Sequence, residues 1–164
     1  DTSEYCTYKI DNDFYNAKSF EDILPKDKVS FKNSLDFVMP INSEIYAVRA
    51  GIVIKVIDNN TKTCFTKNCA QYNNVILIYH DDGSFSEYAH INTNGSLVKE
   101  GDRVTESQLI AKSGNIGMSS GPHLHFSVYL QRIEKKERLK TKFKVNDGAE
   151  VLFLEEKETY IRNY

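Results

Sequence analysis

Short runs of β-branched and aromatic residues follow one another along most of this chain, and turn signals separate them. Such runs are typical of strands, and Asp82-Gly83 between two of them predicts a tight hairpin. No run has the length and period of a long helix. The pattern therefore predicts an all-β fold with an antiparallel β-sandwich or barrel-like core. The predicted strands are residues 45–48, 51–57, 75–80, 85–90, 109–112 and 123–130.

Two segments differ from this pattern. Residues 1–30 contain many Asp, Asn, Ser and Lys residues and few apolar residues at regular spacing. We expect an irregular N-terminal segment there, with a short helix at 17–23, followed by one domain over 31–164. Residues 131–144 include seven Lys or Arg residues and are predicted as a short helix or a link between strands. We expect a solvated face in this second segment, with contact to an anionic polymer as the alternative.

Charge and hydropathy exclude some classes of protein. The 21 basic and 23 acidic side chains leave a net charge of −2, whereas a dedicated nucleic-acid-binding domain is usually strongly basic. No apolar run reaches the roughly 18 residues of a membrane helix, so we expect no membrane segment in this chain. The first residue is Asp1 rather than Met, and we expect that an upstream signal peptide or anchor has been removed.

The three cysteines leave a question open. Cys64 and Cys69 are close enough in sequence to form a small-loop disulfide in an oxidising compartment. Two unpaired thiols in a loop are the alternative, and Cys6 adds little to either interpretation.

The histidines are the candidates for chemistry. His123 and His125 begin an alternating apolar strand, so their side chains point to one face, about 6.6 Å apart along the strand. One imidazole could then hold a metal while the other faces a bound water or substrate, and Ser119 to Pro122 brings backbone close to that face. The alternative is a pair of histidines hydrogen-bonded at a strand end. His90 ends another predicted strand and is a candidate for the same face.

Asp36 and His80 complete the candidate polar groups. Asp36 is flanked by Leu35 and Phe37, and a buried carboxylate needs a metal, a cation or a hydrogen-bond donor as its partner. His80 lies beside Asp81 and Asp82 at the end of a predicted strand, where we expect a structural role.

Taken together, these motifs resemble a known family. The segments LDFVMPINSEIYAVRAGIV, NNVILIYHDDGSFSEYAHI and LVKEGDRVTESQLIAKSGNIGMSSGPHLHFSV occur in this order between residues 34 and 130. They resemble the zinc endopeptidases of the lysostaphin and LytM type. The resemblance implies a β-sheet core with a zinc-floored groove, peptidoglycan peptide cross-links as substrate class, and a secreted, periplasmic or cell-envelope location.

The resemblance also implies roles for individual residues. By position, Asp36 and His125 are zinc ligands, and His123 and His90 assist catalysis at the scissile carbonyl. In such sites three protein ligands leave the fourth zinc position to a water, whose pKa the metal lowers toward about 7.

One position departs from the family pattern. The first zinc ligand of the family is a histidine, commonly four residues before the aspartate, and here that position is Lys32, with Phe31 before it. No histidine precedes His80. A protonated lysine repels a cation, but its ammonium could pair with Asp36 and replace the charge of zinc. We therefore expect weak or absent zinc binding and a degenerate, non-catalytic domain that binds peptidoglycan peptide or a partner hydrolase of the cell wall.

Two alternatives stay open. An active zinc metalloendopeptidase needs a substitute ligand from a partner chain or from residues 1–30, where Asp11, Asp13 and Glu21 are candidates. The segment VKEGDRVTESQLIAKSG also suggests a lipoyl- or biotin-carrier module. That alternative leaves the two histidines at 123 and 125 unexplained, and Met39 and Met118 have no adjacent lysine.

Overall fold

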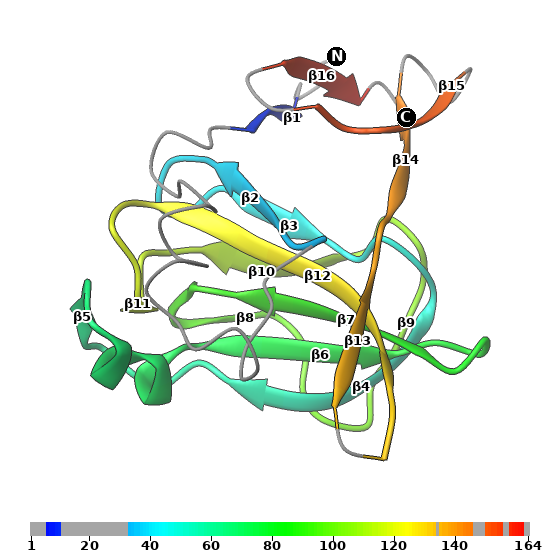
Figure 1. Ribbon diagram of the computed structural model, residues 1–164. Coiled ribbons are helices and arrows are strands. Elements are labelled where there is room, and N and C mark those ends of the chain that lie inside the picture. The colour runs from blue at the N-terminus through cyan, green and yellow to red at the C-terminus, as the bar shows by residue number, and fades with distance from the viewer. Residues whose placement is uncertain (1–5, 11–32, 134, 146–149, 156–157, 163–164) are drawn as a thin grey trace.

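A computed structural model describes residues 6–10, 33–133, 135–145, 150–155 and 158–162. The described residues form strands and one short 3₁₀ helix (Figure 1). The elements are β1 (Cys6–Ile10), β2 (Leu35–Val38), β3 (Glu44–Tyr46), β4 (Gly51–Ile57), β5 (Thr63–Cys64), η1 (Lys67–Tyr72), β6 (Val75–Tyr79), β7 (Ser84–Ala89), β8 (Ile91–Ser96), β9 (Arg103–Val104), β10 (Leu109–Ser113), β11 (Gly117–Met118), β12 (His123–Gln131), β13 (Lys136–Leu139), β14 (Lys142–Val145), β15 (Glu150–Phe153) and β16 (Thr159–Arg162).

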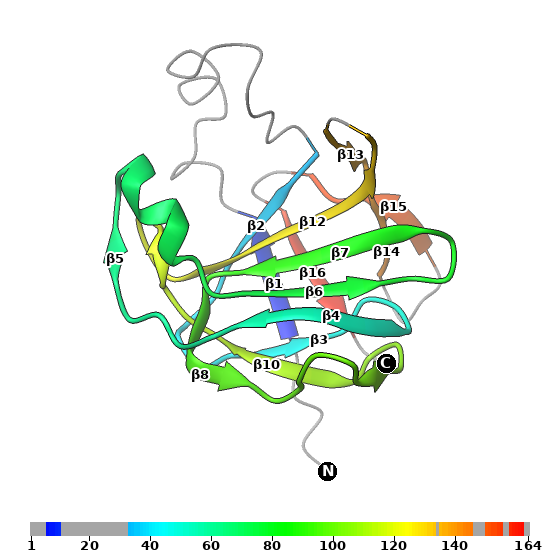
Figure 2. The ribbon, with the colours of Figure 1, turned by 90° about the horizontal axis from the view of Figure 1, so that it is seen from below.

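Two sheets lie face to face. The larger has nine strands in the order β16-β1-β2-β12-β7-β6-β4-β9, with β13 also paired to β12, and the smaller has the order β3-β10-β8. All pairs in both sheets are antiparallel. Figure 2 shows β12, β7, β6 and β4 as one layer above β3, β10 and β8. The predicted antiparallel sandwich is confirmed, and no sheet formed by the described residues closes into a barrel.

The predicted hairpin forms between β6 and β7. His80 and Ser84 are joined by a backbone hydrogen bond of 2.9 Å, and Gly83 occupies the left-handed region with φ of 83°. Asp82 Oδ1 accepts hydrogen bonds from the Ser84 amide and hydroxyl. The Asp-Gly sequence therefore supplies both the turn conformation and the cap of this hairpin.

The structure differs from the sequence predictions at both ends of the domain. Cys6–Ile10 forms strand β1 between β2 and β16, so the expectation of an irregular segment is wrong for these five residues. The short helix expected at 17–23 lies outside the described residues. The charged stretch 131–144 contributes β13 and β14 rather than a helix, and its Lys136 and Arg132 form ion pairs at the surface.

The hydrophobic core lies between the two sheets, and β12 shows how the sequence fills it. Leu124 and Phe126 alternate with His123 and His125, so that one face of the strand enters the core and the other carries the imidazoles. The Phe126 ring packs against Tyr88 with ring centroids 5.2 Å apart.

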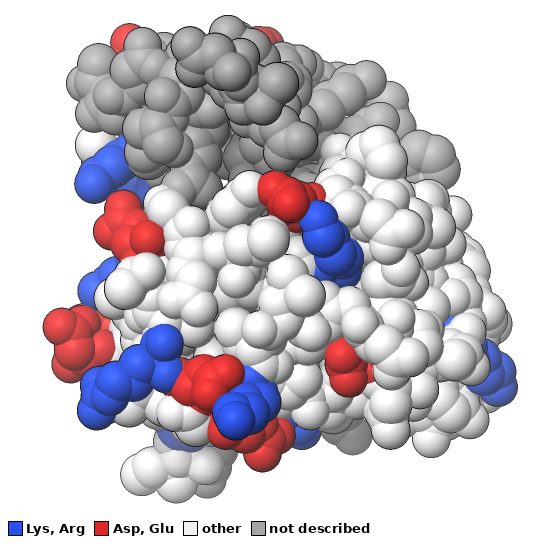
Figure 3. All heavy atoms as spheres, turned by 180° about the vertical axis from the view of Figure 1, so that it is seen from behind, with Lys and Arg blue, Asp and Glu red and all other residues white. Residues whose placement is uncertain are grey.

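The remaining surface shows mixed charge. Seen from the side opposite to that in Figure 1, basic and acidic side chains are interspersed among uncharged ones (Figure 3). Opposite charges also pair directly, as in the ion pair between Lys112 and Glu44 at 2.9 Å. The described part of this face thus carries no extended basic patch of the kind that binds nucleic acid.

Two buried polar side chains of the core, His80 and Tyr88, are hydrogen-bonded. His80 is fully buried, and its Nδ1 donates to the Ala50 carbonyl at 2.8 Å while its Nε2 accepts from Ser86 Oγ at 3.0 Å. The structural role predicted for His80 is confirmed. The hydroxyl of Tyr88 accepts the Val48 amide hydrogen at 2.9 Å, and burial raises the pKa of Tyr88 to about 12, so it remains a neutral phenol.

Replacing Tyr88 tests this core bond. Tyr88→Phe leaves the Val48 amide without its acceptor, and we expect the free energy of unfolding to fall by about 1–3 kcal/mol. Urea denaturation followed by circular dichroism measures the change. Tyr79→Phe is the matched control, because Tyr79 is 38% exposed and a surface change usually stays within about 0.5 kcal/mol. Equal losses in the two variants would contradict the assignment.

Candidate functional site

Four polar side chains meet on the outer face of the large sheet. Strand β12 lies between β2 and β7, and its His125 is paired in register with Asp36 on one side and Ala89 on the other. His90 directly follows Ala89. The register of these three strands brings Asp36, His90, His123 and His125 together, so the structure places His90 on the face that strand alternation predicted for His123 and His125, with Asp36 beside them as the resemblance implied.

Asp36 lies at the centre of this cluster. Its Oδ1 is 2.7 Å from His125 Nδ1 and 3.7 Å from His123 Nε2. The His90 ring centroid is 4.5 Å from that of His123 and 6.1 Å from that of His125. All four side chains are largely buried, and the Asp36 carboxylate has the hydrogen-bond donor that its apolar flanks require.

Backbone carbonyls orient two of the rings. His90 Nδ1 donates to the Ile116 carbonyl at 2.7 Å, and His123 Nδ1 donates to the Gly121 carbonyl at 2.8 Å. Because a carbonyl oxygen only accepts, each neutral ring carries its proton on Nδ1 and keeps Nε2 as the basic nitrogen. The backbone of His90 has φ of 64°, a left-handed conformation that typically costs a non-glycine residue roughly 1–2 kcal/mol.

Burial and neighbouring side chains lower the pKa values of three groups in the cluster, Asp36, His90 and His123. Burial lowers the pKa of His90 to about 3, and the neighbouring His123 and His125 add to this effect. Burial also lowers the pKa of His123. For Asp36 burial acts in the opposite direction, but the hydrogen bond and positive charge of His125 outweigh it and hold the pKa below its usual value. At neutral pH the site thus contains an ionised Asp36 carboxylate beside neutral His90 and His123 rings, and the carboxylate is the form in which aspartate binds zinc.

Two of the described residues have side chains of the types that bind zinc. Asp36 and His125 have the donor atoms that zinc prefers, and their facing atoms, Oδ1 and Nδ1, already lie side by side. No group of three His, Cys, Asp or Glu side chains within the described ranges is arranged to hold a metal ion. A catalytic zinc site normally has three protein ligands. Lys32, Phe31 and the candidates Asp11, Asp13 and Glu21 lie outside the described residues.

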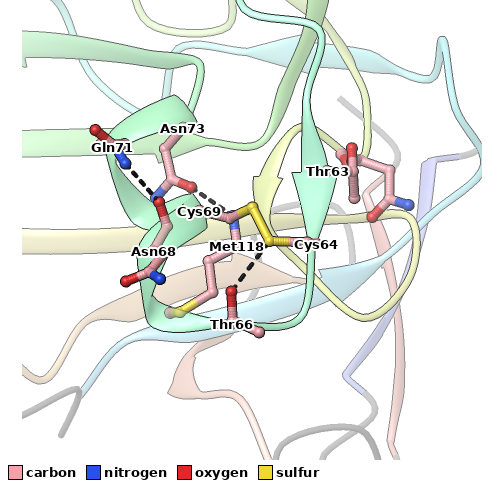
Figure 4. Close-up of a disulfide and its surroundings, with 9 residues drawn as sticks. Thr63, Cys64, Thr66, Asn68, Cys69, Gln71, Asn73 and Met118 are labelled. Atoms are coloured by element: carbon pink, nitrogen blue, oxygen red, sulfur yellow. Dashed lines mark hydrogen bonds between the residues drawn. A yellow bond between two sulfur atoms is a disulfide. The ribbon is translucent and has the colours of Figure 1, made fainter.

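A disulfide decides the question left open for the cysteines. Cys64 and Cys69 are bonded, with their Cα atoms 5.8 Å apart. We call residues 62–73, which contain β5, this bond and η1, the disulfide loop (Figure 4). In Figure 4 Met118 lies beside the bond. Residues 115–119, here called the support segment, include β11 and lead toward His123.

Sequence reasoning missed part of the surroundings of the site. It indicated that Ser119 to Pro122 brings backbone close to the histidines, and the Gly121 carbonyl confirms this. It did not find the Ile116 carbonyl that holds His90, nor the proximity of the disulfide loop. The contact is made by the backbone carbonyl of Ile116, so the type of side chain at position 116 does not indicate it.

Most of the sequence of this chain matches a known family of peptidases. The model of Peptidase family M23 matches residues 30–138 of this chain. The chain belongs to peptidase family M23. The match includes the segment 98–114 that suggested a carrier module, so that alternative is wrong.

Two curated relatives are about one third identical to this chain over the aligned residues. An uncharacterized metalloprotease of Buchnera aphidicola is 33% identical over 136 residues, which are 82% of this chain and 32% of the relative. The peptidoglycan DD-endopeptidase ShyA of Vibrio cholerae is 32% identical over 104 residues, 63% of this chain and 21% of ShyA. The M23 chain described here therefore spans a third or less of these two relatives.

Solved structures agree with the fold. The catalytic domain of lysostaphin from Staphylococcus simulans superimposes with a TM-score of 0.52 at 26% identity, covering 66% of this chain and 76% of that domain. A zinc containing peptidase from Vibrio cholerae gives a TM-score of 0.52 at 30% identity, covering 72% of this chain and 32% of that one. This M23 chain thus has the lysostaphin/LytM-type fold. Among its described residues, no helix is long and apolar enough to cross a membrane.

The buried His90 makes a pH-dependent contribution to stability. Its pKa of about 3 in the folded state lies below the unfolded value of about 6.5. The unfolded state therefore binds more protons between these values, so the stability is complete above pH 6.5 and is lost as the pH falls. Between pH 6.5 and 5 the loss from this group is about 2 kcal/mol.

His90→Asn tests this contribution, because asparagine tolerates the left-handed conformation and does not titrate. We expect its unfolding free energy, measured by urea denaturation in EDTA, to depend less on pH between 7 and 5 than that of the wild type. The same acid dependence in both proteins would show that His90 is not the group responsible.

Proposed function

We propose that this chain is a cell-wall-associated M23 domain that binds peptidoglycan peptides and has lost zinc catalysis. The single observation that carries the proposal is Lys32, which occupies the position four residues before Asp36 where the family pattern has its first zinc ligand. The other two ligand positions, Asp36 and His125, are retained. A secreted, periplasmic or cell-envelope location belongs to the same proposal.

Peptidoglycan as the ligand is supported by the relatives. ShyA is a peptidoglycan DD-endopeptidase by name, and a glycyl-glycine endopeptidase of Staphylococcus capitis is 30% identical over 92 residues. The Cys64–Cys69 bond supports an oxidising compartment outside the cytosol. A partner hydrolase of the cell wall is the other ligand that a retained but non-catalytic groove could bind.

Loss of zinc follows from ligand chemistry. Disturbing only a group that supports a ligand typically weakens metal affinity about 10- to 100-fold, so the loss of a ligand itself costs at least as much. A protonated lysine at position 32 adds repulsion of the cation, and its pairing with Asp36 would supply the positive charge that the buried carboxylate otherwise takes from zinc. The domain then folds without metal.

A second candidate function is an active zinc metalloendopeptidase with a substitute ligand. It is favoured by the close packing of Asp36, His90, His123 and His125. Asp36 and His125 would hold the metal, which when bound supplies an acidified water and polarises the scissile carbonyl. His90 and His123 would keep Nε2 available to take or return a proton, because their Nδ1 protons are bonded to backbone carbonyls.

Zinc stoichiometry separates the two candidates. After incubation with excess zinc and desalting, we expect elemental analysis to find well below one zinc per wild-type chain. Lys32→His restores the missing type of ligand and should raise the zinc content close to one ion per chain. We also expect this variant to cleave peptidoglycan. Lys28→His is the control for an added histidine in the same segment. Near one zinc in the wild type would overturn the non-catalytic proposal in favour of the active peptidase.

Binding to the cell wall is tested with purified sacculi. We expect the wild type to sediment with sacculi without releasing soluble peptides, and the variant His123→Ala/His125→Ala to bind roughly tenfold more weakly, since both rings line the site. Asp81→Asn, whose side chain is 96% exposed on the β6–β7 hairpin, is the control. Wild-type protein that stays in the supernatant would argue against peptidoglycan and leave a partner hydrolase as the ligand.

A further inference from the structure

The disulfide loop and the support segment are joined by four hydrogen bonds, which involve both ends of the loop. Two support-segment amides donate to loop carbonyls, a third donates to a loop side chain, and one loop hydroxyl donates in return. These bonds are Gly117 N to Lys62 O (2.8 Å), Ser119 N to Cys64 O (3.3 Å), Met118 N to Asn73 Oδ1 (2.9 Å) and Thr63 Oγ1 to Asn115 O. Strands β5 and β11 also pair in parallel. The position of the support segment is therefore set by the loop.

The support segment in turn holds two imidazoles of the site. The Ile116 carbonyl accepts the Nδ1 proton of His90 at 2.7 Å. Ser119 Oγ lies 3.2 Å from His123 Nδ1 and donates to the Gly121 carbonyl at 2.8 Å, the same oxygen that accepts from the His123 ring. A shift of the support segment would therefore change the hydrogen bonds of both rings.

Gly117 allows the loop and the support segment to approach closely. Its φ is 93°, and a Cβ at this position would lie 1.9 Å from Asn73 Oδ1 and 2.7 Å from Asn73 Cα. Contacts this short cannot persist, so any side chain at position 117 would push the support segment away from Asn73, the residue that follows η1. The contact thus depends on a glycine in a conformation that other residues rarely adopt.

The disulfide stabilises the conformation in which the loop contacts the support segment. Apart from the Cys64–Cys69 bond, the loop contains a two-residue strand and a six-residue 3₁₀ helix. Short 3₁₀ helices have poor hydrogen-bond geometry and little stability of their own. Cys69 is fully buried, so the bond links the helix to β5 from inside the loop.

We propose that the disulfide loop is the positioning element of the histidine cluster: it fixes the support segment and thereby the rings of His90 and His123. Asn73 and the Cys64–Cys69 bond are then positioning groups, which act on the ligand only through these rings. Where this inference concerns affinity for peptidoglycan peptide, it rests on the proposed function above.

Three changes separate the loop from the support segment by different means. Gly117→Ala introduces the steric clash, Asn73→Ala removes the acceptor of the Met118 amide, and Cys64→Ser/Cys69→Ser removes the bond. Long-range proton–nitrogen NMR at neutral pH reports which nitrogen of each ring is protonated. We expect His90 and His123 to lose their uniform Nδ1–H form in all three variants. Isothermal titration with a soluble peptidoglycan stem peptide should show roughly tenfold weaker binding, the scale typical of lost supporting contacts.

Gly101→Ala is the matched control. Gly101 has φ of 91°, close to that of Gly117, but a Cβ there meets no atom within 4 Å. This variant therefore carries the backbone strain without the clash, and we expect the ring signals and the peptide affinity of the wild type. Asn73→Asp, which keeps an oxygen acceptor for the Met118 amide, should also retain the wild-type ring signals.

The outcomes distinguish the two proposals. If the wild type does not bind the peptide, the proposed function fails, while the ring signals still decide whether the loop positions the histidines. Unchanged ring signals in the folded variants would overturn the positioning role, as would equal changes in Gly117→Ala and Gly101→Ala. If Gly117→Ala does not fold, Asn73→Ala and the double serine variant give the decision.

Discussion

The hydrogen bond between Asp36 and His125 depends on one feature of the fold, the register of β12 between β2 and β7. Because side chains alternate along a strand, the same register places Leu124 and Phe126 in the core. A slip of one residue would bury the imidazoles and expose the aromatic ring. Packing of the sandwich and assembly of the site are therefore a single requirement, and the hydrophobic core supplies the free energy that holds the polar cluster in place.

A buried carboxylate also constrains what this site can do. Asp36 is ionised and largely buried, so its charge must be compensated by a hydrogen-bond donor, a cation or both. An M23 peptidase meets this demand with zinc, and we propose that Lys32 takes over in this chain. The catalytic potential of the domain then depends on a single ligand position, although the rest of the cluster is retained.

The sequence predicted those features that side chains encode directly. Strand runs such as 123–130 and the face shared by His123 and His125 were predicted from strand alternation, whereas Asp36 was placed with them only through the resemblance to the lysostaphin and LytM type. Strand β1 was missed, since its partners β2 and β16 are distant in sequence and it lies in the segment 1–30, which is rich in Asp, Asn, Ser and Lys. The carbonyl contact of His90 could not be found, because a backbone oxygen has no sequence signature. Whether Cys64 and Cys69 form a disulfide could not be decided from the sequence, since their spacing alone does not determine the distance between their Cα atoms.

The disulfide closes a ring between residues only five positions apart, whereas β5 and β11 are separated by more than fifty residues. Closing a short loop requires little chain entropy and no tertiary structure, so this covalent bond is available while the chain is still largely unfolded. The contact with β11 has a much higher entropic cost and must await the sandwich. If the disulfide forms before the chain folds, the disulfide loop is already closed when β11 pairs with β5. The histidine cluster would then be positioned by a loop that formed earlier.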